Sequence, residues 1–167
     1  MIGDSFYKNS KKALENIYKL SQKSRWIIKV IWVVASVKYA RKIVNKDLFP
    51  MSVHIVHNLT REEMCSLYIQ SDVLLFDSMS EGFGYPILEA MSHGLPVITR
   101  NFGAMKEVAG DAAMFLSQDS SNLPDLIMSL NEEEHIKNLV NKGYKNVSRF
   151  SQEKFGKEML KIYHSVV

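Results

Sequence analysis

The feature that most constrains the fold of this sequence lies within residues 73–99, where two apolar runs flank a glycine-rich loop and a proline. The first run, Val73 to Phe76, is short, rich in branched side chains and without polar alternation, which is typical of a strand buried on both faces. Gly82 and Gly84 follow this run. Because neither has a Cβ, the backbone there can take unusual dihedral angles and approach another molecule closely.

Pro86 predicts a helix start, because the first turn of a helix does not need every N–H group. Gly94 and Pro96 predict the end of that helix, and Val97 to Thr99 predict a second strand. In an open parallel sheet such a loop lies at the carboxyl ends of the strands, where ligands bind and helix-start N–H groups suit an anion. We therefore expect an α/β fold with a doubly wound parallel sheet.

Two glutamates lie on either side of the glycine-rich loop. Glu81 precedes the glycines, and Glu89 follows after seven intervening residues, about one turn into the predicted helix. A carboxylate there can accept hydrogen bonds from neighbouring hydroxyls such as those of a ribose, and Glu81 is placed to meet whatever a ligand carries beyond its phosphates. The alternative is two solvated surface acids. The loop between them favours a binding site.

Residues Ser80 to Met91, SEGFGYPILEAM, resemble the Glu-x7-Glu segment of the retaining glycosyltransferases called group 1. Enzymes of that family use nucleotide-diphosphate sugars and have two Rossmann domains, an arrangement called GT-B. The similarity extends upstream into residues 67–73 and downstream into residues 94–98 and 107–113. It covers the chain well from Val53 to the C-terminus and loosely over the first fifty residues.

The resemblance implies that residues 1–167 form a single Rossmann-like donor-binding domain, one half of a hexosyltransferase of the GT-B type in polysaccharide biosynthesis. The implied donor is a UDP or GDP sugar, the acceptor is a glycan or a lipid-linked molecule, and no metal or other cofactor is expected. The family's N-terminal Rossmann domain, which holds the acceptor, is not part of the chain. We expect it as a partner in cis or in trans, and a short strand at Met1 to Gly3 would fit a chain that begins at the domain boundary.

Roles for individual residues follow from the same resemblance. Glu81 is the catalytic candidate, because it would hold the hydroxyls of the transferred sugar, and Glu89 would bind the ribose. Further contacts to the donor are expected from Gly82, Phe83, Gly84, Asn58, Leu59 and Gly103. The N–H groups of the glycine-rich loop would stabilise the charge that develops on the leaving diphosphate.

Lys8 is the basic residue expected to contact the diphosphate. The first loop of the family's donor-binding domain carries such a residue, and Gly3 followed by Tyr7-Lys8-Asn9 is similar to one variant of it. The commoner variant adds an arginine a few residues earlier, and here no arginine precedes Arg25. A solvated lysine near a helix start is the alternative for Lys8.

Two functions of other kinds are alternatives to glycosyl transfer. One is a non-catalytic nucleotide-sugar-binding or regulatory module with the same fold. The other is a doubly wound domain of the epimerase kind, which is disfavoured because no Gly-x-Gly-x-x-Gly follows the first expected strand.

Charge and cysteine content indicate the surroundings of the protein. The formal net charge of +3 suits contact with anionic small molecules, and the basic residues do not cluster enough to predict nucleic-acid binding. The single cysteine, Cys65, cannot form an internal disulfide and favours a reducing compartment. Lys38, Arg41, Lys42 and Lys46 form either a solvated face or a weak membrane-surface patch. We expect a cytoplasmic protein, with a peripheral position at the inner membrane surface left open.

The remaining pattern predicts the other elements of the sheet. Arg25 to Val37 is the most apolar stretch, is too short to cross a bilayer, and predicts a buried central strand at about Ile27 to Ala35. Val53 to His57 predicts another strand, after which Thr60 and Glu63 predict a capping box at a helix start.

Helices and a last strand complete the predicted chain. The expected helices cover about residues 10–21, 37–45, 123–130, 132–148 and 151–164, and the last strand covers 113–115. Ser151 is expected as the N-cap of the final helix. That helix carries an apolar stripe of Phe155, Met159 and Tyr163, which would be only partly covered if nothing else were present.

Overall fold

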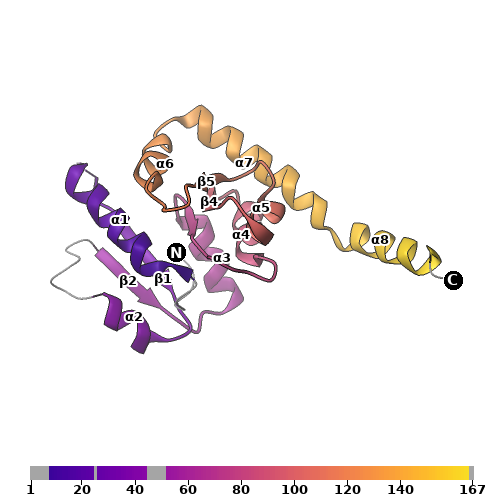
Figure 1. Cartoon of the computed structure of the whole chain (residues 1–167), viewed down its shortest axis with the longest axis horizontal. Coiled ribbons are helices and arrows are strands. Elements are labelled where there is room, and N and C mark those ends of the chain that lie inside the picture. Colours follow the sequence, from indigo (N-terminus) through magenta and orange to yellow (C-terminus); the bar gives the residue numbers. More distant parts are fainter. Residues whose placement is uncertain (1–7, 25, 45–51, 166–167) are drawn as a thin grey trace.

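The computed structural model of the chain describes residues 8–24, 26–44 and 52–165, in which helices and strands largely alternate (Figure 1). The strands are β1 (Lys29–Val33), β2 (Ser52–Val56), β3 (Leu74–Phe76), β4 (Val97–Arg100) and β5 (Met114–Leu116). The α-helices are α1 (Ser10–Lys23), α2 (Val37–Ile43), α3 (Arg61–Gln70), α4 (Tyr85–Ser92), α5 (Gly103–Ala109), α6 (Leu123–Ser129), α7 (Glu133–Val147) and α8 (Gln152–Ser165). A 3-10 turn, η2 (Ser148–Phe150), joins α7 to α8.

Every strand pair within the described residues is parallel. β1 pairs with β2, and β3, β4 and β5 are neighbours in that order. Both groups of strands share one buried cluster, which contains Trp32 of β1 and Ile98 of β4. The loops that follow β3, β4 and β5 therefore leave the sheet at one edge, because parallel strands end on the same side.

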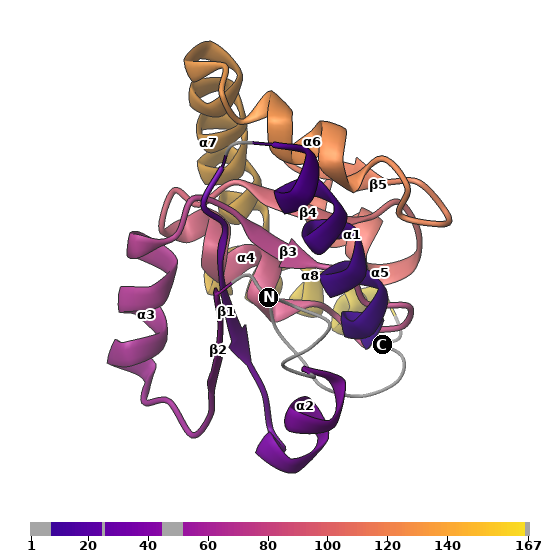
Figure 2. The same cartoon turned by 90° about the vertical axis from the view of Figure 1, so that its left-hand side faces the viewer.

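Helices cover both faces of the sheet. Leu75 of β3 belongs to one buried cluster, while Leu74 and Phe76 belong to another, because successive side chains of a strand point to opposite faces. Helices α1, α2 and α6 contribute to the first cluster, and α3, α4 and α5 contribute to the second. Figure 2 shows α1 and α3 on opposite sides of the strands. This is the doubly wound α/β fold that the sequence predicts.

The predicted helix starts are confirmed by their hydrogen bonds. The Thr60 hydroxyl accepts the Glu63 N–H at 3.2 Å, and the Glu63 carboxylate accepts the Thr60 N–H at 2.8 Å, which completes the capping box. Pro86 is the second residue of α4. At α8, the Ser151 hydroxyl accepts the N–H of Lys154 at 3.3 Å.

The start of β1 differs from its prediction. The ladder with β2 begins at Lys29 opposite Ser52, and Ile27 is 98% exposed. The prediction that Ile27 is buried in the strand is therefore wrong, because Ile27 stands in the connection from α1 before the ladder begins. The predicted helix over residues 37–45 ends at Ile43. The expected strand at residues 1–3, Tyr7 and the stretch 45–51 lie outside the described residues.

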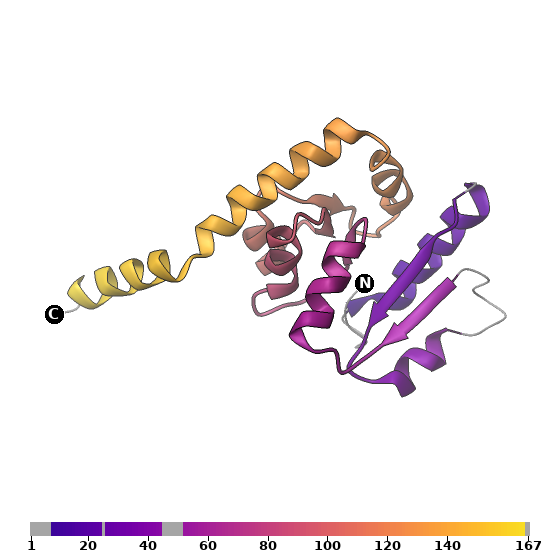
Figure 3. The same ribbon diagram turned by 180° about the vertical axis from the view of Figure 1, so that it is seen from behind.

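Helix α8 extends away from the sheet and its covering helices (Figures 1 and 3). None of its described residues is buried, and Phe155 and Tyr163 are 69% and 57% exposed. The predicted apolar stripe is thus only partly covered, with Met159 half-buried. In the described part of the chain, no helix combines the length and hydrophobicity that crossing a membrane requires.

Gly84 occupies a backbone conformation that residues with a side chain rarely adopt. Its φ is +101°, and a Cβ built there would lie 3.4 Å from the Ile87 Cδ1 atom. Gly84→Ala should therefore lower the free energy of unfolding by about 1–2 kcal/mol, measured by urea denaturation. The matched control is Gly82→Ala, where a Cβ would meet nothing within 4 Å and the free energy should change by less than about 0.5 kcal/mol. Equal effects of the two substitutions would contradict this account.

Candidate functional site

Lys8 and Glu81 form an ion pair at the edge of the sheet where β3 ends. The Lys8 ammonium donates a hydrogen bond to Glu81 Oε1, and both side chains are 16% exposed. The same ammonium lies 5.1 Å from the centre of the Phe76 ring, which gives it a second favourable contact. Two residues that the sequence predicted for different parts of one donor are thus in direct contact.

The glycine-rich loop begins directly after Glu81 and leads into α4. Gly82 is exposed and Gly84 is the N-cap of α4. The first N–H groups of a helix have no partners within the helix, so this loop offers donors to a ligand. The Phe83 ring does not share that role, because it packs 4.7 Å from the Tyr85 ring and edge-on, at 5.6 Å, against Phe150. The donor-binding prediction for Phe83 therefore concerns its main chain.

Glu89, the fifth residue of α4, faces α3. Its carboxylate accepts a hydrogen bond from the Tyr68 hydroxyl, with 2.9 Å between the two oxygens. Tyr68 is 4% exposed, whereas Glu89 is exposed. Burial, together with the bond to Glu89, raises the pKa of Tyr68 well above its ordinary value, so this phenol stays protonated and remains a donor.

A buried ion pair between Asp77 and Arg100 lies where β3 and β4 end. Asp77 directly follows β3, Arg100 ends β4, and they are 3% and 5% exposed. The Arg100 Nε–H donates to the Asp77 carboxylate, and the other guanidinium nitrogens donate to the Ser120 hydroxyl at 2.9 Å and to the Gln118 carbonyl at 2.6 Å. Burial raises the pKa of Asp77, and the Arg100 guanidinium opposes that rise. Because all these groups have partners, the pair is compatible with a buried position.

Asn9 connects this pair to the start of α1. Its side-chain amide donates to Asp77 Oδ2 at 2.8 Å. Asn9 is the N-cap of α1 and has the left-handed backbone conformation, with a φ of 50°. Because Asn9 is adjacent to Lys8 in sequence, its hydrogen bond to Asp77 positions the backbone next to Lys8. Sequence reasoning missed Asp77, Arg100 and Asn9, because each is an isolated polar residue and Asn9 and Asp77 are 68 positions apart.

The remaining predicted residues lie at the starts of other helices. Asn58 and Leu59 stand between β2 and α3, and Gly103 is the first residue of α5. Asn58 and Gly103 have φ values of 52° and 58°, and both are exposed. A Cβ at Gly103 would meet nothing within 4 Å, so its main chain is open to a ligand.

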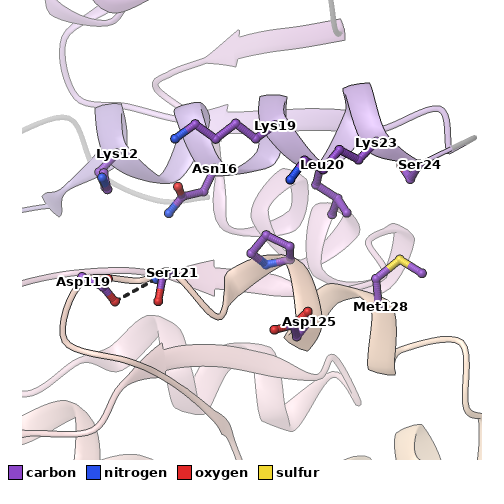
Figure 4. A pocket seen from close by; sticks show the side chains of 11 residues that line it. Lys12, Asn16, Lys19, Leu20, Lys23, Ser24, Asp119, Ser121, Asp125 and Met128 are labelled. Atoms are coloured by element: carbon purple, nitrogen blue, oxygen red, sulfur yellow. Dashed lines mark hydrogen bonds between the residues drawn. The ribbon is translucent and has the colours of Figure 1, made fainter.

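A groove lies elsewhere, between α1 and α6. It has a volume of about 590 Å³, with Lys12, Lys19 and Lys23 on one side and Asp119 and Asp125 on the other (Figure 4). The N–H and hydroxyl of Ser121, with the Ser117 hydroxyl, lower the pKa of Asp119 to about 2, so this carboxylate is bound within its own loop. No predicted site residue lines the groove. Nor do the described residues gather three potential metal ligands.

Removing one member of the buried pair should be costly. Arg100→Met leaves the Asp77 carboxylate buried without its cation, so the free energy of unfolding should fall by about 3–5 kcal/mol in urea denaturation. Adding Asp77→Leu should restore part of that loss, because the uncompensated charge is then gone. As a control, Arg61→Met at an exposed position of α3 should cost less than about 0.5 kcal/mol. Arg100→Met no more costly than this control would refute the assigned role.

Comparison with known protein families gives a match over most of the chain. The model of the family described as glycosyl transferases group 1 matches residues 4–153. The serotype-specific mannosyltransferase WbdA of Escherichia coli is 38% identical over 76 residues, which are 46% of this chain and 9% of that protein. The O-antigen chain mannosyltransferase B of Escherichia coli is 30% identical over 104 residues, 61% of this chain and 27% of that protein. The chain thus spans a minor part of these relatives.

Solved structures share the fold at low sequence identity. The C-terminal domain of the group 1 glycosyl transferase LpcC from Francisella tularensis superposes with a TM-score of 0.70 at 21% identity, covering 90% of this chain and 83% of that one. The pneumococcal O-GlcNAc transferase GtfA, solved in complex with UDP and GlcNAc, gives 0.75 at 16% identity, covering 99% of this chain and 35% of that one. These similarities show a Rossmann-like half of the GT-B fold.

Proposed function

Because the chain belongs to the group 1 glycosyltransferase family, we propose that it is the donor-binding half of a retaining glycosyltransferase. It binds a nucleotide-diphosphate sugar at the edge of the sheet where β3 and β4 end, and the sugar passes to a glycan or a lipid-linked acceptor. The observation that carries the proposal is the placement of the Lys8–Glu81 ion pair beside the glycine-rich loop, with Glu89 one turn into the helix that follows.

The ion pair supports a binding step in which partners are exchanged. A diphosphate that reaches Lys8 competes with Glu81 for the ammonium, since both are anionic. Glu81 is then available to accept hydrogen bonds from the sugar hydroxyls. The Lys8 charge and the N–H groups of the loop stabilise the diphosphate as it leaves, and in this proposal they act in place of a divalent metal.

Glu89 supplies the contact to the nucleotide in this proposal. Its carboxylate is exposed and can accept hydrogen bonds from both hydroxyls of a ribose. Asn58, Leu59 and Gly103 contribute main-chain contacts from neighbouring loops. Two relatives are named mannosyltransferases, and one structural neighbour was solved with UDP and GlcNAc, which supports a hexose donor carried by a nucleoside diphosphate.

A second Rossmann domain completes the proposed site. The chain spans less than a third of the two mannosyltransferases reported above, so their sequences hold further segments. Exposed apolar side chains precede and follow the donor loop in sequence, at Met79 and Tyr85, and others are exposed at Phe102 and on α8. A partner domain, in cis or in trans, would cover this surface and bring the acceptor to the sugar.

We also propose a cytoplasmic location, peripheral to the inner membrane surface where lipid-linked acceptors are anchored. The exposed basic side chains of α2, Lys38, Arg41 and Lys42, support it, because they suit anionic headgroups. The free cysteine, Cys65, fits a reducing compartment.

Substitutions of Glu81 and Glu89 should change ligand affinity in different ways. Glu89→Ala should weaken a nucleoside diphosphate and the matching nucleotide sugar alike, by about 1–3 kcal/mol, because it removes a charged hydrogen-bond acceptor. Glu81→Ala should weaken the nucleotide sugar, because the contact to the sugar is lost. It should not weaken the nucleoside diphosphate, because the carboxylate that competes with the diphosphate for Lys8 is removed. Calorimetric titration with UDP, GDP and their hexose derivatives, in the presence of EDTA, measures both.

A matched control for these variants is Glu107→Ala, an exposed glutamate of α5. It should leave every affinity unchanged. Failure of the wild-type chain to bind any uridine, guanosine or adenosine diphosphate at millimolar concentration would refute the proposed function. Equal losses of nucleoside diphosphate affinity in both variants would refute the division of roles and leave the site standing.

Sugar transfer should need the partner domain. One domain forms only one side of the cleft, so it can neither exclude water from the reacting centre nor position an acceptor. These two effects supply much of the reduction of the activation barrier in an enzyme. The purified chain, incubated with a donor that binds, should therefore transfer no sugar to lipid-linked or soluble acceptors. Transfer at an ordinary enzymatic rate by the monomeric chain would contradict this. Binding without transfer even after the partner domain is added would favour a non-catalytic module.

A further inference from the structure

Tyr68 contacts the proposed ribose-binding glutamate from the adjacent helix. It belongs to α3, is 4% exposed, and packs in the same buried cluster as Ile87 and Ala90 of α4. Its hydroxyl donates to Oε2 of the exposed Glu89 at 2.9 Å. A side chain fixed in the core thus contacts a carboxylate at the surface, and the core can set the geometry of a group that solvent would otherwise leave mobile.

The surroundings of Glu89 hold its main chain as well. The Glu89 carbonyl accepts a hydrogen bond from the Ser92 hydroxyl at 2.7 Å, and the Nδ1 atom of His93 lies 2.7 Å from the same oxygen. The His93 ring also packs on the Tyr68 ring, with 5.6 Å between centroids. Burial and the contact with His93 therefore hold the Tyr68 ring in place. Its hydroxyl is fixed relative to α4, the helix that carries Glu89.

The hydrogen bond leaves the carboxylate with capacity to spare. An ionised carboxylate has about four acceptor sites, and Tyr68 uses one of them on Oε2. Because burial keeps the Tyr68 phenol protonated, it stays a donor and does not compete with a ligand's hydroxyls for the role of acceptor. Two neighbouring hydroxyls can then donate to the remaining sites, which the Tyr68 contact holds in one orientation.

We infer that Tyr68 is a positioning residue that sets the preference of the site for a ribose with both hydroxyls, by fixing the Glu89 carboxylate from the buried side. The inference rests on the proposed function, in which Glu89 binds the ribose. An exposed glutamate samples several rotamers, and ordering it when the ligand binds costs affinity. Because Tyr68 already orders the Glu89 carboxylate in the folded protein, the ligand does not have to order it on binding.

The test compares two ligands that differ only in the ribose hydroxyls. Tyr68→Phe keeps the ring and removes the hydroxyl, and affinities are measured by calorimetry for a nucleoside diphosphate and for its 2′,3′-dideoxy form. The variant should bind the ribonucleotide about 3- to 10-fold more weakly, as expected for one lost hydrogen bond. Its affinity for the dideoxy form should stay within about twofold of the wild type, since that ligand lacks the two hydroxyls that Glu89 would bind.

Two further variants make the comparison specific. Tyr144→Phe, on α7 and 51% exposed, removes a tyrosine hydroxyl outside the proposed site and should change neither affinity. In a Glu89→Ala background, Tyr68→Phe should have no further effect on the preference for ribose, because its partner is absent.

The outcomes distinguish the inference from the proposed function. A structural role for Tyr68 alone would weaken both ligands equally or neither, and either result overturns the inference while the nucleotide site stands. A preference for ribose that Tyr68→Phe lowers even in the Glu89→Ala background overturns it too. If the wild-type chain binds no nucleotide at all, the proposed function fails and the inference fails with it.

Discussion

The arrangement of this site depends on one buried ion pair, formed by Asp77 and Arg100 at the ends of two adjacent strands. Bringing two charges out of water costs several kcal/mol per ion, and only complete hydrogen bonding offsets such a cost. Here that requirement is met by three groups from two further segments: the Asn9 amide at the start of α1, and the Ser120 hydroxyl and Gln118 carbonyl of the loop after β5. The pair can be stable only when β3, β4, the loop after β5 and the start of α1 are all in place.

This dependence gives the site a rigid base beneath an open surface. The base is the network around Asp77, which fixes the residue next to Lys8. The surface consists of groups that a ligand can reach, such as the exposed Gly82 and the exposed carboxylate of Glu89. Tyr68 repeats the same relation on the α3 side, where a buried donor fixes an exposed acceptor. In both places a buried polar contact orders a side chain of the candidate site, which is how preorganised sites are generally built.

The sequence predicts those parts of the protein that local patterns determine. The buried strand predicted at Val73 to Phe76, the helix started by Pro86 and the capping box of Thr60 and Glu63 follow from neighbouring residues. The structure contains all three, with the strand at Leu74–Phe76. The doubly wound fold follows from their order. Ile27 shows the limit, because hydrophobicity alone cannot tell whether a residue enters the sheet or precedes it. The contacts of Asp77, Arg100 and Tyr68 are likewise not visible in the sequence, since each depends on partners that are distant in sequence and adjacent only in space.

The Lys8–Glu81 contact has a consequence for how the protein would separate the ligand it uses from the one it must discard. On the proposed function, any anion that claims Lys8 has to displace a carboxylate, and the displaced Glu81 regains its hydrogen bonds only if the ligand carries a sugar. The intact donor satisfies both residues, whereas the nucleoside diphosphate left after transfer satisfies Lys8 and leaves Glu81 without hydroxyls. Glu81 then competes for Lys8 again. On this proposal Glu81 would displace the spent nucleotide from Lys8, and chloride or inorganic phosphate, which carry no sugar, would occupy the site poorly for the same reason.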